Sequence, residues 1–451
     1  MLVNFKVSNF CSFDDEQVFS MEAGKARAHS DRVYSVKKTK LLKFMAVYGA
    51  NASGKTNLIK ALDYSKHMII HGLSSDYSDC YCKLNPENVE RPSIFEYTIE
   101  LNGKQFRYGF AVILKTRSIV KEWLYELTYG NNYKIIFERN IIEKKYIVNY
   151  YFKNESINER LAIYADDIKE DDSIPFLLLM NQNKVSFYDS FPEAKVYQDV
   201  WKWFQHTLSV NAPDRPITNY TYILNSENIE RISQLMSMFS TGISAFKLVT
   251  ISFEKIAANI PKELLKDITD RLTAHQKELA AQETYSDYAV LLRDFSDNSM
   301  FILRLNEDGE AIAQTFQVNH HKTSAFFSLQ EESDGTVRLL DLIEILLTAD
   351  DEKVYVIDEI NRRFHPLLSY RFVEEYLKIA ADQHVQLIVS THESRLMDLN
   401  LLRKDEISFV NKNDSGCSQI YSLDKFGERF DKKISSAYLH GEYDAIPVFD
   451  S

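Results

Sequence analysis

One eight-residue segment constrains the fold of this chain more than any other. Residues 49–56 are Gly-Ala-Asn-Ala-Ser-Gly-Lys-Thr, which fits G-x-x-x-x-G-K-[ST] at every fixed position. An apolar run at 43–48 precedes the segment, and apolar residues with helical spacing follow it over 56–64. A small-residue turn between a buried strand and a helix lets backbone N–H groups surround a phosphate. The segment therefore predicts an α/β fold with a phosphate-binding loop, and an accidental glycine turn is the alternative.

The side chains of this loop suit a nucleoside triphosphate. The Lys55 ammonium is a point charge for the β- and γ-phosphates, and the Thr56 hydroxyl is a hard oxygen ligand for Mg²⁺. The amino end of the following helix adds a favourable dipole. We therefore expect ATP and Mg²⁺ as ligands. The residues predicted to bind the nucleotide are Asn51, Ala52, Ser53, Gly54, Lys55, Thr56 and Asn57.

A pair of carboxylates is the second strong signal. Four apolar residues at 354–357 end in Asp358 and Glu359, as at the carboxyl edge of a buried parallel strand. Asp358 would hold Mg²⁺ through water, and Glu359 would act as the general base on the attacking water. An ordinary strand that runs into an acidic turn is the alternative interpretation.

Two shorter motifs flank the carboxylate pair. A buried strand over 385–390 is followed by His392, which is placed to reach a γ-phosphate and to sense its hydrolysis. Ser333 and Gly335 come just before a helix whose apolar residues face inward. Ser333 is either a helix N-cap or, together with the Gly335 amide, a contact to the γ-phosphate of a second subunit.

The predicted elements divide the chain into three parts. The first part continues from the loop into an antiparallel meander, the middle part is largely helical, and helices alternate with strands from residue 336 onward. The middle helices are too short for a long coiled-coil arm. The meander strands are expected at 93–101, 105–115, 119–128 and 133–139, with turns at Gly103 and Gly130-Asn131-Asn132, and a later turn at 307–309. The predicted domains are 1–185, 186–318 and 319–451.

Composition narrows the class of function. The 53 basic and 65 acidic side chains give a net charge of −12, which argues against coating of nucleic acid but leaves a local basic groove open. Four cysteines are too few for a disulfide framework in 451 residues, so we expect free thiols and a cytoplasmic location. Cys80 and Cys82 lack the partners of a zinc site. No apolar run approaches the ~18 residues of a membrane-spanning helix.

The order of these motifs resembles the ABC-type ATPases of the SMC, RecF and OLD branch. It is more similar still to the compact AAA-type ATP-binding proteins of bacterial antiphage defence and abortive-infection systems, including the PARIS ATPase. The likeness spans both ends of the chain and covers the middle third only in layout. Cys11 stands where the family often has a basic residue, and the signature glycine pair is reduced to Asp334-Gly335. The segments that carry the likeness are Asn9-Phe10-Cys11-Ser12, Tyr48 to Asn57, Asp358-Glu359 with His365-Pro366, Ser390-Thr391-His392-Glu393, Arg403-Lys404-Asp405, Tyr438-Leu439-His440-Gly441 and Ala445-Ile446-Pro447.

The resemblance implies an ABC-type head, an α/β P-loop NTPase whose mixed sheet carries an antiparallel β meander and an inserted helical subdomain. In such heads two subunits sandwich ATP, so Ser333 and Gly335 would complete the site in trans within a homodimer or a larger homo-oligomer. Gln182, after the apolar run 176–180, is the candidate for the Q-loop glutamine. The implied reaction is hydrolysis of ATP to ADP and phosphate.

The resemblance also implies a biological role. The chain would be the sensor or regulator of an antiphage defence system, controlling a separate nuclease or toxin in response to a phage protein or nucleic acid, without a membrane partner. Three alternatives remain open: a RecF- or SMC-like DNA-binding repair ATPase, an OLD-like ATPase acting with a nuclease, and a non-hydrolysing ATP-binding scaffold. The short segment after His392 disfavours a nuclease domain within this chain.

Overall fold

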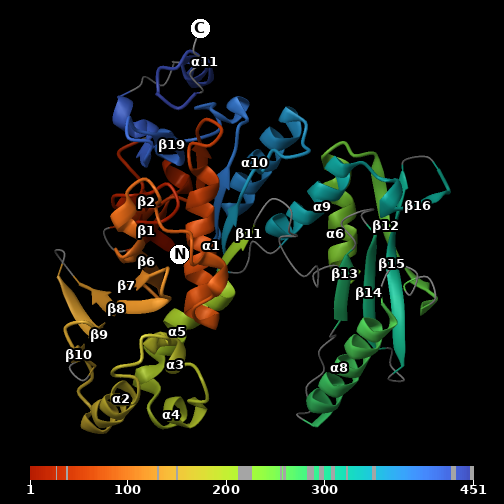
Figure 1. The fold of residues 1–451 in the computed structure, drawn as a ribbon. Helices are drawn as coiled ribbons and strands as arrows, with labels where there is room; N and C mark the ends of the chain where they lie inside the picture. The colour runs from red at the N-terminus through yellow and green to blue at the C-terminus, as the bar shows by residue number, and fades with distance from the viewer. Residues whose placement is uncertain are drawn as a thin grey trace. The chain divides into compact units, whose positions relative to one another are not determined.

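In the computed structural model, the chain forms two compact units (Figure 1). Unit 1 comprises Met1–Asp214, Ala349–Arg362 and Tyr376–Ser451, and unit 2 comprises Arg215–Thr348 and Arg363–Glu375. The structure describes residues 1–26, 28–36, 39–128, 132–148, 151–211, 226–253, 256, 261–281, 289–293, 299–305, 310–320, 323–347, 352–427 and 433–446. The predicted turns at 130–131 and 307–309 lie outside the described residues, as does Pro447.

A six-stranded sheet in unit 1 carries the phosphate-loop segment. Its strand order is β11-β17-β18-β5-β19-β20, in which the first five strands are parallel and β20 pairs antiparallel with β19. The central strands β5, β17 and β18 are buried at every residue, which explains their continuous apolar runs. The strands span β5 Phe44–Tyr48, β11 Leu208–Asn211, β17 Val354–Ile357, β18 Gln386–Ser390, β19 Ile407–Lys412 and β20 Ser418–Ser422.

A second, seven-stranded sheet in unit 1 is the predicted meander. Its order is β10-β9-β8-β7-β6-β1-β2, every pair is antiparallel, and the predicted first strand is β1. Glycine is required at Gly109, because a Cβ there would lie 2.4 Å from the Trp123 ring on the neighbouring strand. The strands span β1 Leu2–Ser8, β2 Gln17–Ser20, β6 Ser93–Leu101, β7 Lys104–Ile113, β8 Ser118–Leu127, β9 Tyr133–Asn140 and β10 Lys145–Ile147. A two-stranded ribbon of β3 Tyr34–Val36 and β4 Thr39–Leu41 completes the strands of unit 1.

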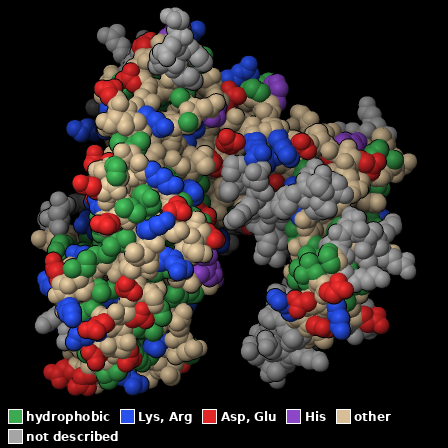
Figure 2. Space-filling model, in the orientation of Figure 1, with side chains coloured by type: hydrophobic (Ala, Val, Ile, Leu, Met, Phe, Trp, Pro, Cys, Tyr) green, Lys and Arg blue, Asp and Glu red, His purple; other side chains and the backbone are tan. Residues whose placement is uncertain are grey.

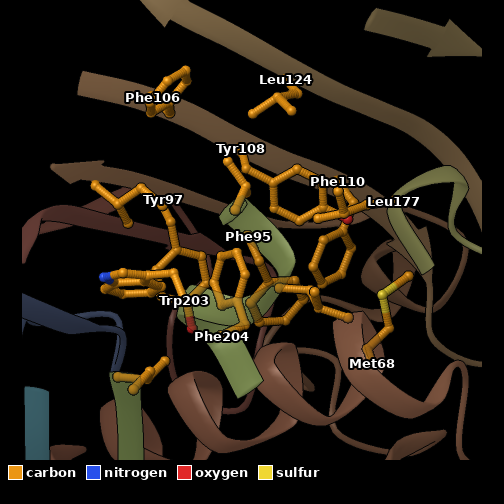
Figure 3. Close-up of a cluster of buried hydrophobic side chains, with 14 of the residues drawn as sticks. Met68, Phe95, Tyr97, Phe106, Tyr108, Phe110, Leu124, Leu177, Trp203 and Phe204 are labelled. Carbon is orange, nitrogen blue, oxygen red and sulfur yellow. The ribbon is translucent and has the colours of Figure 1, made fainter. Parts of the chain in front are cut away.

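An aromatic core joins the seven-stranded sheet to α1 (Lys55–His71) and to the helical segment around Trp203 (Figure 3). Tyr97 packs edge to face on Phe204, and its hydroxyl lies 2.6 Å from the hydroxyl of Ser65 on α1. This core anchors the helix that follows the phosphate-loop segment. The other helices of unit 1 are α2 Glu155–Asp167, α3 Phe176–Leu179, α4 Val185–Ser190, α5 Val196–Lys202, which continues as a π-turn over Trp203–Thr207, and α11 Ile434–Leu439.

Unit 2 is built on a five-stranded antiparallel sheet with helices. The strand order is β12-β15-β14-β13, and β16 pairs with β15. Apolar side chains of α8 form a small core with β14 and β15 around Leu272, Leu303 and Ala313. The sequence analysis did not identify β12, whose residues are mostly half-buried. The elements span α6 Ser226–Met238, β12 Ile243–Ile251, α8 Lys262–Ala281, β13 Ala289–Arg293, β14 Met300–Leu305, β15 Ala311–His320, β16 Phe326–Ser328 and α9 Asp334–Leu347.

The architecture confirms the predicted fold class, a P-loop α/β fold with mixed sheets and an antiparallel meander. The bounds of the compact units differ from those of the predicted domains: unit 2 begins at Arg215 rather than 186 and extends through Thr348. Helix α10 (Pro366–Ala380) begins in unit 2 and ends in unit 1. Among the described residues, no helix has the length and apolarity to cross a bilayer.

Candidate functional site

The predicted phosphate loop connects β5 to α1 at the carboxyl edge of the six-stranded sheet. β5 ends at Tyr48, and α1 begins at Lys55. Glycine is required at Gly54, where φ is +116° and a Cβ would lie 2.3 Å from the Ser418 hydroxyl oxygen. Ala52 also has a positive φ, of 62°. The β19–β20 hairpin packs directly against the loop and leaves no room for a side chain at Gly54.

A hydroxyl network holds the loop from outside. The Ser418 hydroxyl donates to the Ser53 carbonyl oxygen (2.6 Å) and lies 2.7 Å from the Ser12 hydroxyl. The Ser12 hydroxyl also accepts from the side-chain amide of Asn57 (2.7 Å). Asn57, which was predicted to bind nucleotide, therefore has a structural partner. Ser12 and Ser418 lie about 400 residues apart in the sequence, so no local pattern relates them.

Lys55 points back into the loop. Its ammonium donates to the carbonyl oxygens of Gly49 (2.8 Å) and Ala50 (3.0 Å). Burial lowers the pKa of Lys55 to about 8, and the nearby Asp358 and Glu359 carboxylates oppose that shift. A bound phosphate would supply the anionic partner that a buried ammonium lacks in this arrangement.

The loop fits a phosphate on two further observations. The Ser53 hydroxyl oxygen is buried and has no hydrogen-bond partner among the described residues. A buried polar atom without a partner costs free energy. Gly54 is the N-cap of α1 and, as a glycine, supplies no side chain to the amides of the first helical turn. Asn51, Ala52 and Thr56 are exposed there. The loop therefore presents backbone and hydroxyl groups to an anion.

The two carboxylates follow β17 on the same edge of the sheet. The Asp358 side chain is buried, and its Oδ1 accepts a hydrogen bond from the Ser390 hydroxyl at the end of β18. The same hydroxyl accepts from the backbone N–H of Glu359 (2.8 Å). Glu359 is half-buried and has a left-handed backbone with φ of 51°. Ser390 thus bonds to both residues of the carboxylate pair.

His392 is held beside the carboxylates by Asn361. The Asn361 side-chain oxygen accepts from the Thr391 hydroxyl (2.9 Å) and from the backbone N–H of His392 (3.3 Å). The His392 ring keeps solvent exposure. Its partial burial first, and the Lys55 charge second, lower the pKa of the histidine, against the opposing charges of Glu359 and Asp358. A lowered pKa favours the neutral imidazole at pH 7.

The structure therefore brings Lys55, Asp358, Glu359 and His392 together around the phosphate loop, close enough for their charges to interact. The residues come together because β5, β17 and β18 are parallel, so that their carboxyl ends lie at the same edge of the sheet. Thr56 and Asp358 are hard oxygen donors that suit Mg²⁺, which is commonly bound by one or two protein oxygens together with phosphate and water. The set of donors fits the predicted ligands.

The predicted Q-loop glutamine is not brought to this cluster. Gln182 is exposed and lies shortly after α3. Helix α3 packs at the carboxyl end of α1, because a Cβ on Gly72 there would lie 3.7 Å from Leu178 of α3. That end is about 25 Å along the helix from the phosphate loop, at ~1.5 Å per residue, so we do not retain Gln182 as a nucleotide ligand. Ser333 and Gly335 belong to unit 2.

Ser333 is the N-cap of α9 in this structure. Its hydroxyl accepts from the backbone N–H of Thr336 (3.1 Å), and the Ser333 side chain is exposed. Gly335 has a packing reason to be glycine, because a Cβ would lie 2.9 Å from the Arg363 carbonyl oxygen. The cap accounts for the serine without a ligand. The exposed hydroxyl accepts the cap bond and still carries an O–H that can donate to another group. The role of Ser333 and Gly335 in trans stays a prediction.

Sequence reasoning assigned no role to Ser390 or Asn361. Asn361 lies two residues after Glu359, and Ser390 lies two residues before His392. The usable signal was the polar residue at the end of a buried strand, which faces the ends of neighbouring parallel strands. Their partners became known only when β17 and β18 were paired.

Replacing Ser390 with alanine should lower ATP turnover by about 10- to 100-fold, because a displaced catalytic group costs that much in rate. The change leaves Asp358 Oδ1 and the Glu359 N–H without their shared partner. We expect kcat to fall and KM for ATP to change little, since Lys55 and the loop are untouched. Steady-state phosphate release measures both. Ser408→Ala, a change of another buried serine in the same sheet, is the control, and equal losses in the two variants would contradict a positioning role for Ser390.

Two segments of the chain match a known protein family. Residues 44–195 and 243–398 match the family model described as "AAA domain, putative AbiEii toxin, Type IV TA system". The chain matches none of the curated proteins.

Among solved structures, the chain is similar to three SMC head domains. One is an SMC head bound to the C-winged helix domain of ScpA, with 13% identity over 93% of this chain and 97% of that one and a TM-score of 0.42. The second is the SMC head domain from Thermotoga maritima, with 14% identity over 93% of this chain and 98% of that one and a TM-score of 0.33. The third is an Smc head domain with an extended coiled coil, bound to the C-terminal domain of ScpA derived from Pyrococcus furiosus. Its identity is 15% over 94% of this chain and 97% of that one, and the TM-score is 0.36. Similarity at this level carries no information on partners.

Proposed function

The chain belongs to the AAA-domain family whose model it matches over more than half its length, and from that premise we propose that it binds ATP with Mg²⁺ and hydrolyses it to ADP and phosphate. One observation carries the proposal: two carboxylates and a histidine from neighbouring strand ends lie near Lys55 of a loop whose buried Ser53 hydroxyl has no partner among the described residues. Phosphate release by the purified chain, with and without Mg²⁺, tests it.

Each residue of the cluster has a proposed part in the reaction. Lys55 and the amides at the start of α1 hold the phosphates, and Thr56 and Asp358 hold Mg²⁺, which neutralises phosphate charge when bound. Glu359 accepts the proton of the water that attacks the γ-phosphorus. His392, mostly neutral because its pKa is lowered, donates or accepts a hydrogen bond at the γ-phosphate without adding a charge. Ser390 keeps both carboxylates in place.

We propose further that the site is completed by a second copy of the chain. The exposed Ser333 hydroxyl and the amino end of α9 offer hydrogen-bond groups to the γ-phosphate held by a partner. Nucleotide would then control a homodimer or a larger homo-oligomer, since ATP contributes contacts to both copies. Hydrolysis would remove those contacts and release the assembly.

Mixing two inactive variants should restore part of the ATPase activity if the site is shared. Ser333→Arg and Lys55→Ala affect different halves of a shared site, so a mixed dimer has one doubly altered site and one intact site. Phosphate release should reappear when the two proteins are combined, and a large share of the wild-type rate per intact site is expected. Subunit exchange is checked in the same sample with two affinity tags. No recovery despite exchange would mean that each site is made within one chain.

For the biological role, we propose that the ATPase regulates a separate toxic effector in antiphage defence. The resemblance to defence ATPases and the toxin–antitoxin wording of the family description support this role. The test expresses three sets of genes: the chain alone, the chain with its genomic neighbours, and the Glu359→Gln variant with those neighbours. Cell growth and phage plaque counts are measured in each. Growth arrest that needs a neighbouring gene supports a separate effector, whereas arrest by the chain alone would make this chain the toxin.

The principal alternative is a DNA-binding ATPase. On the face seen in Figure 2, Lys and Arg side chains are interspersed with Asp and Glu, and the net charge of −12 adds no general attraction to DNA. We therefore rank DNA binding second. Binding of duplex DNA that weakens steeply with salt, in the presence of ATP, would reverse the ranking.

A further inference from the structure

Two cysteines that are far apart in the sequence meet beside the phosphate loop. The backbone N–H of Cys11 donates to the carbonyl oxygen of Cys80 (2.6 Å), and both side chains are half-buried. The two thiols also lie close enough to shift each other's pKa. Cys82 is nearby but fully buried, and its own pKa is raised by burial. Within the described ranges, no three His, Cys, Asp or Glu side chains form a metal-binding group, so the cysteines are not explained as a metal site.

Lys60 gives the pair a chemical asymmetry. This lysine is on α1, and its ammonium lies near the Cys80 thiol. Interaction with the Cys11 thiol first, and with the Lys60 ammonium second, lowers the pKa of Cys80 to about 6 despite burial. The same contact and burial raise the pKa of Cys11. At pH 7 one sulfur is therefore mainly thiolate and its neighbour is mainly thiol, an arrangement found where one cysteine attacks and another resolves.

We propose that Cys80 is a nucleophile for hydroperoxides and that Cys11 is its resolving thiol. The Cys80 thiolate attacks one peroxide oxygen and the O–O bond breaks, which leaves a sulfenic acid and a hydroxide that takes a proton from solvent. The Cys11 sulfur then attacks the Cys80 sulfur, the S–O bond breaks, and the hydroxide leaves with the Cys11 proton as water. Two thiols are oxidised to one disulfide, and hydrogen peroxide is reduced to two waters.

The backbone around both cysteines favours this bond. A disulfide needs Cα atoms about 4.4–6.8 Å apart, and the direct backbone hydrogen bond between Cys11 and Cys80 holds the two residues side by side. Asn9 fixes the surrounding segments, because its side chain donates to the carbonyl oxygens of Asn88 (2.9 Å) and Arg91 (2.6 Å) and accepts from the Cys82 N–H (3.1 Å). The pair is thus held in contact in the folded chain and does not require a large rearrangement to close.

Closure should affect the phosphate loop, a consequence that rests on the proposed function. A disulfide bond is about 2.05 Å long, shorter than any non-bonded contact between two sulfur atoms, so Cys11 must shift when the bond forms. Ser12 is the next residue and bonds to Asn57 and Ser418 around Gly54, where a Cβ would already lie 2.9 Å from the Ser12 hydroxyl oxygen. A loop packed this closely transmits the shift, and we expect oxidation to weaken ATP binding several-fold and reversibly.

The bond is tested first without nucleotide. The full chain is treated with hydrogen peroxide, its remaining thiols are alkylated before unfolding, and the peptides are mapped by mass spectrometry. We expect a peptide pair joined through Cys11 and Cys80 that dithiothreitol separates. A bridge between Cys80 and Cys82, a bridge between two chains, or four alkylated cysteines would overturn the proposal.

Three variants separate the two roles. Cys11→Ser should leave a sulfenic acid on Cys80 that dimedone captures, and Cys80→Ser should give neither bridge nor dimedone adduct at position 11. Cys417→Ser, which changes the remaining half-buried thiol close to Cys82, should behave as wild type. A dimedone adduct on Cys11 in the Cys80→Ser variant would reverse the proposed roles.

ATP titration of reduced, oxidised and re-reduced protein then tests the consequence. Affinity should fall several-fold in wild type on oxidation, recover with dithiothreitol, and stay unchanged in Cys11→Ser. A disulfide that leaves affinity unchanged would show that the pair does not control the loop. Failure of the reduced protein to bind ATP would instead count against the proposed function, and the peptide map would still decide the bond.

Discussion

Replacing Glu359 with glutamine should nearly abolish ATP hydrolysis while ATP binding survives. Glutamine keeps the size and a hydrogen-bonding group but cannot accept the proton of the attacking water, and loss of a positioned base typically costs ~10²–10⁴-fold in rate. Lys55 and Asp358 keep their own contacts, because the bonds from Lys55 to the loop carbonyls and from Ser390 to Asp358 do not involve the Glu359 side chain. Removing a negative charge beside the γ-phosphate should even tighten binding.

The variant should therefore accumulate ATP-bound assemblies that the wild-type chain forms only briefly. Size-exclusion chromatography with ATP and Mg²⁺, run beside a phosphate-release assay, measures both effects. Glu352→Gln is a matched control, since Glu352 is exposed and lies before the opposite end of the same strand, β17. Near-normal phosphate release by Glu359→Gln would mean that another residue activates the water.

Replacing Lys55 with alanine should remove most of the affinity for ATP. The ammonium is the one cation that the loop itself contributes, and its contacts in this structure are two backbone carbonyl oxygens. Truncating one member of a buried charged pair costs about 2–5 kcal/mol, which corresponds to a loss of roughly 30-fold to several thousand-fold in affinity. The fold should persist, because the aromatic core packs on later turns of α1.

Nucleotide titration followed by calorimetry or fluorescence measures the loss, and circular dichroism checks the fold. Lys66→Ala is the matched control: this lysine lies three turns further along α1, and its ammonium donates to the Leu208 carbonyl oxygen (2.5 Å). Lys66→Ala should keep wild-type affinity. If Lys55→Ala also bound ATP normally, the assignment of the phosphate loop would be wrong.

Local sequence was sufficient to predict the features that depend on residues close together in the chain. The phosphate-loop pattern, the buried strands with polar ends and the alternation of the meander are short-range signals, and they predicted the fold class that the structure confirms. Helix α1 extends to His71, further than its apolar spacing indicated, because its later turns pack on the aromatic core of the meander. Gln182 was chosen from its place after an apolar run, and that run packs at the far end of α1.

What the sequence by itself determined was therefore the set of strand ends and the chemistry that each one carries. Only the tertiary structure decided which ends meet, because strand order is set by long-range pairing and packing. The pairing of β17 with β18 places Ser390 between Asp358 and Glu359, and the packing of the β19–β20 hairpin links Ser418 to Ser12 and the loop. Tertiary packing of other segments brings Cys11 to Cys80 and Lys60. Spacing along a chain holds no information about such contacts, since they depend on how separate elements are arranged around a common core.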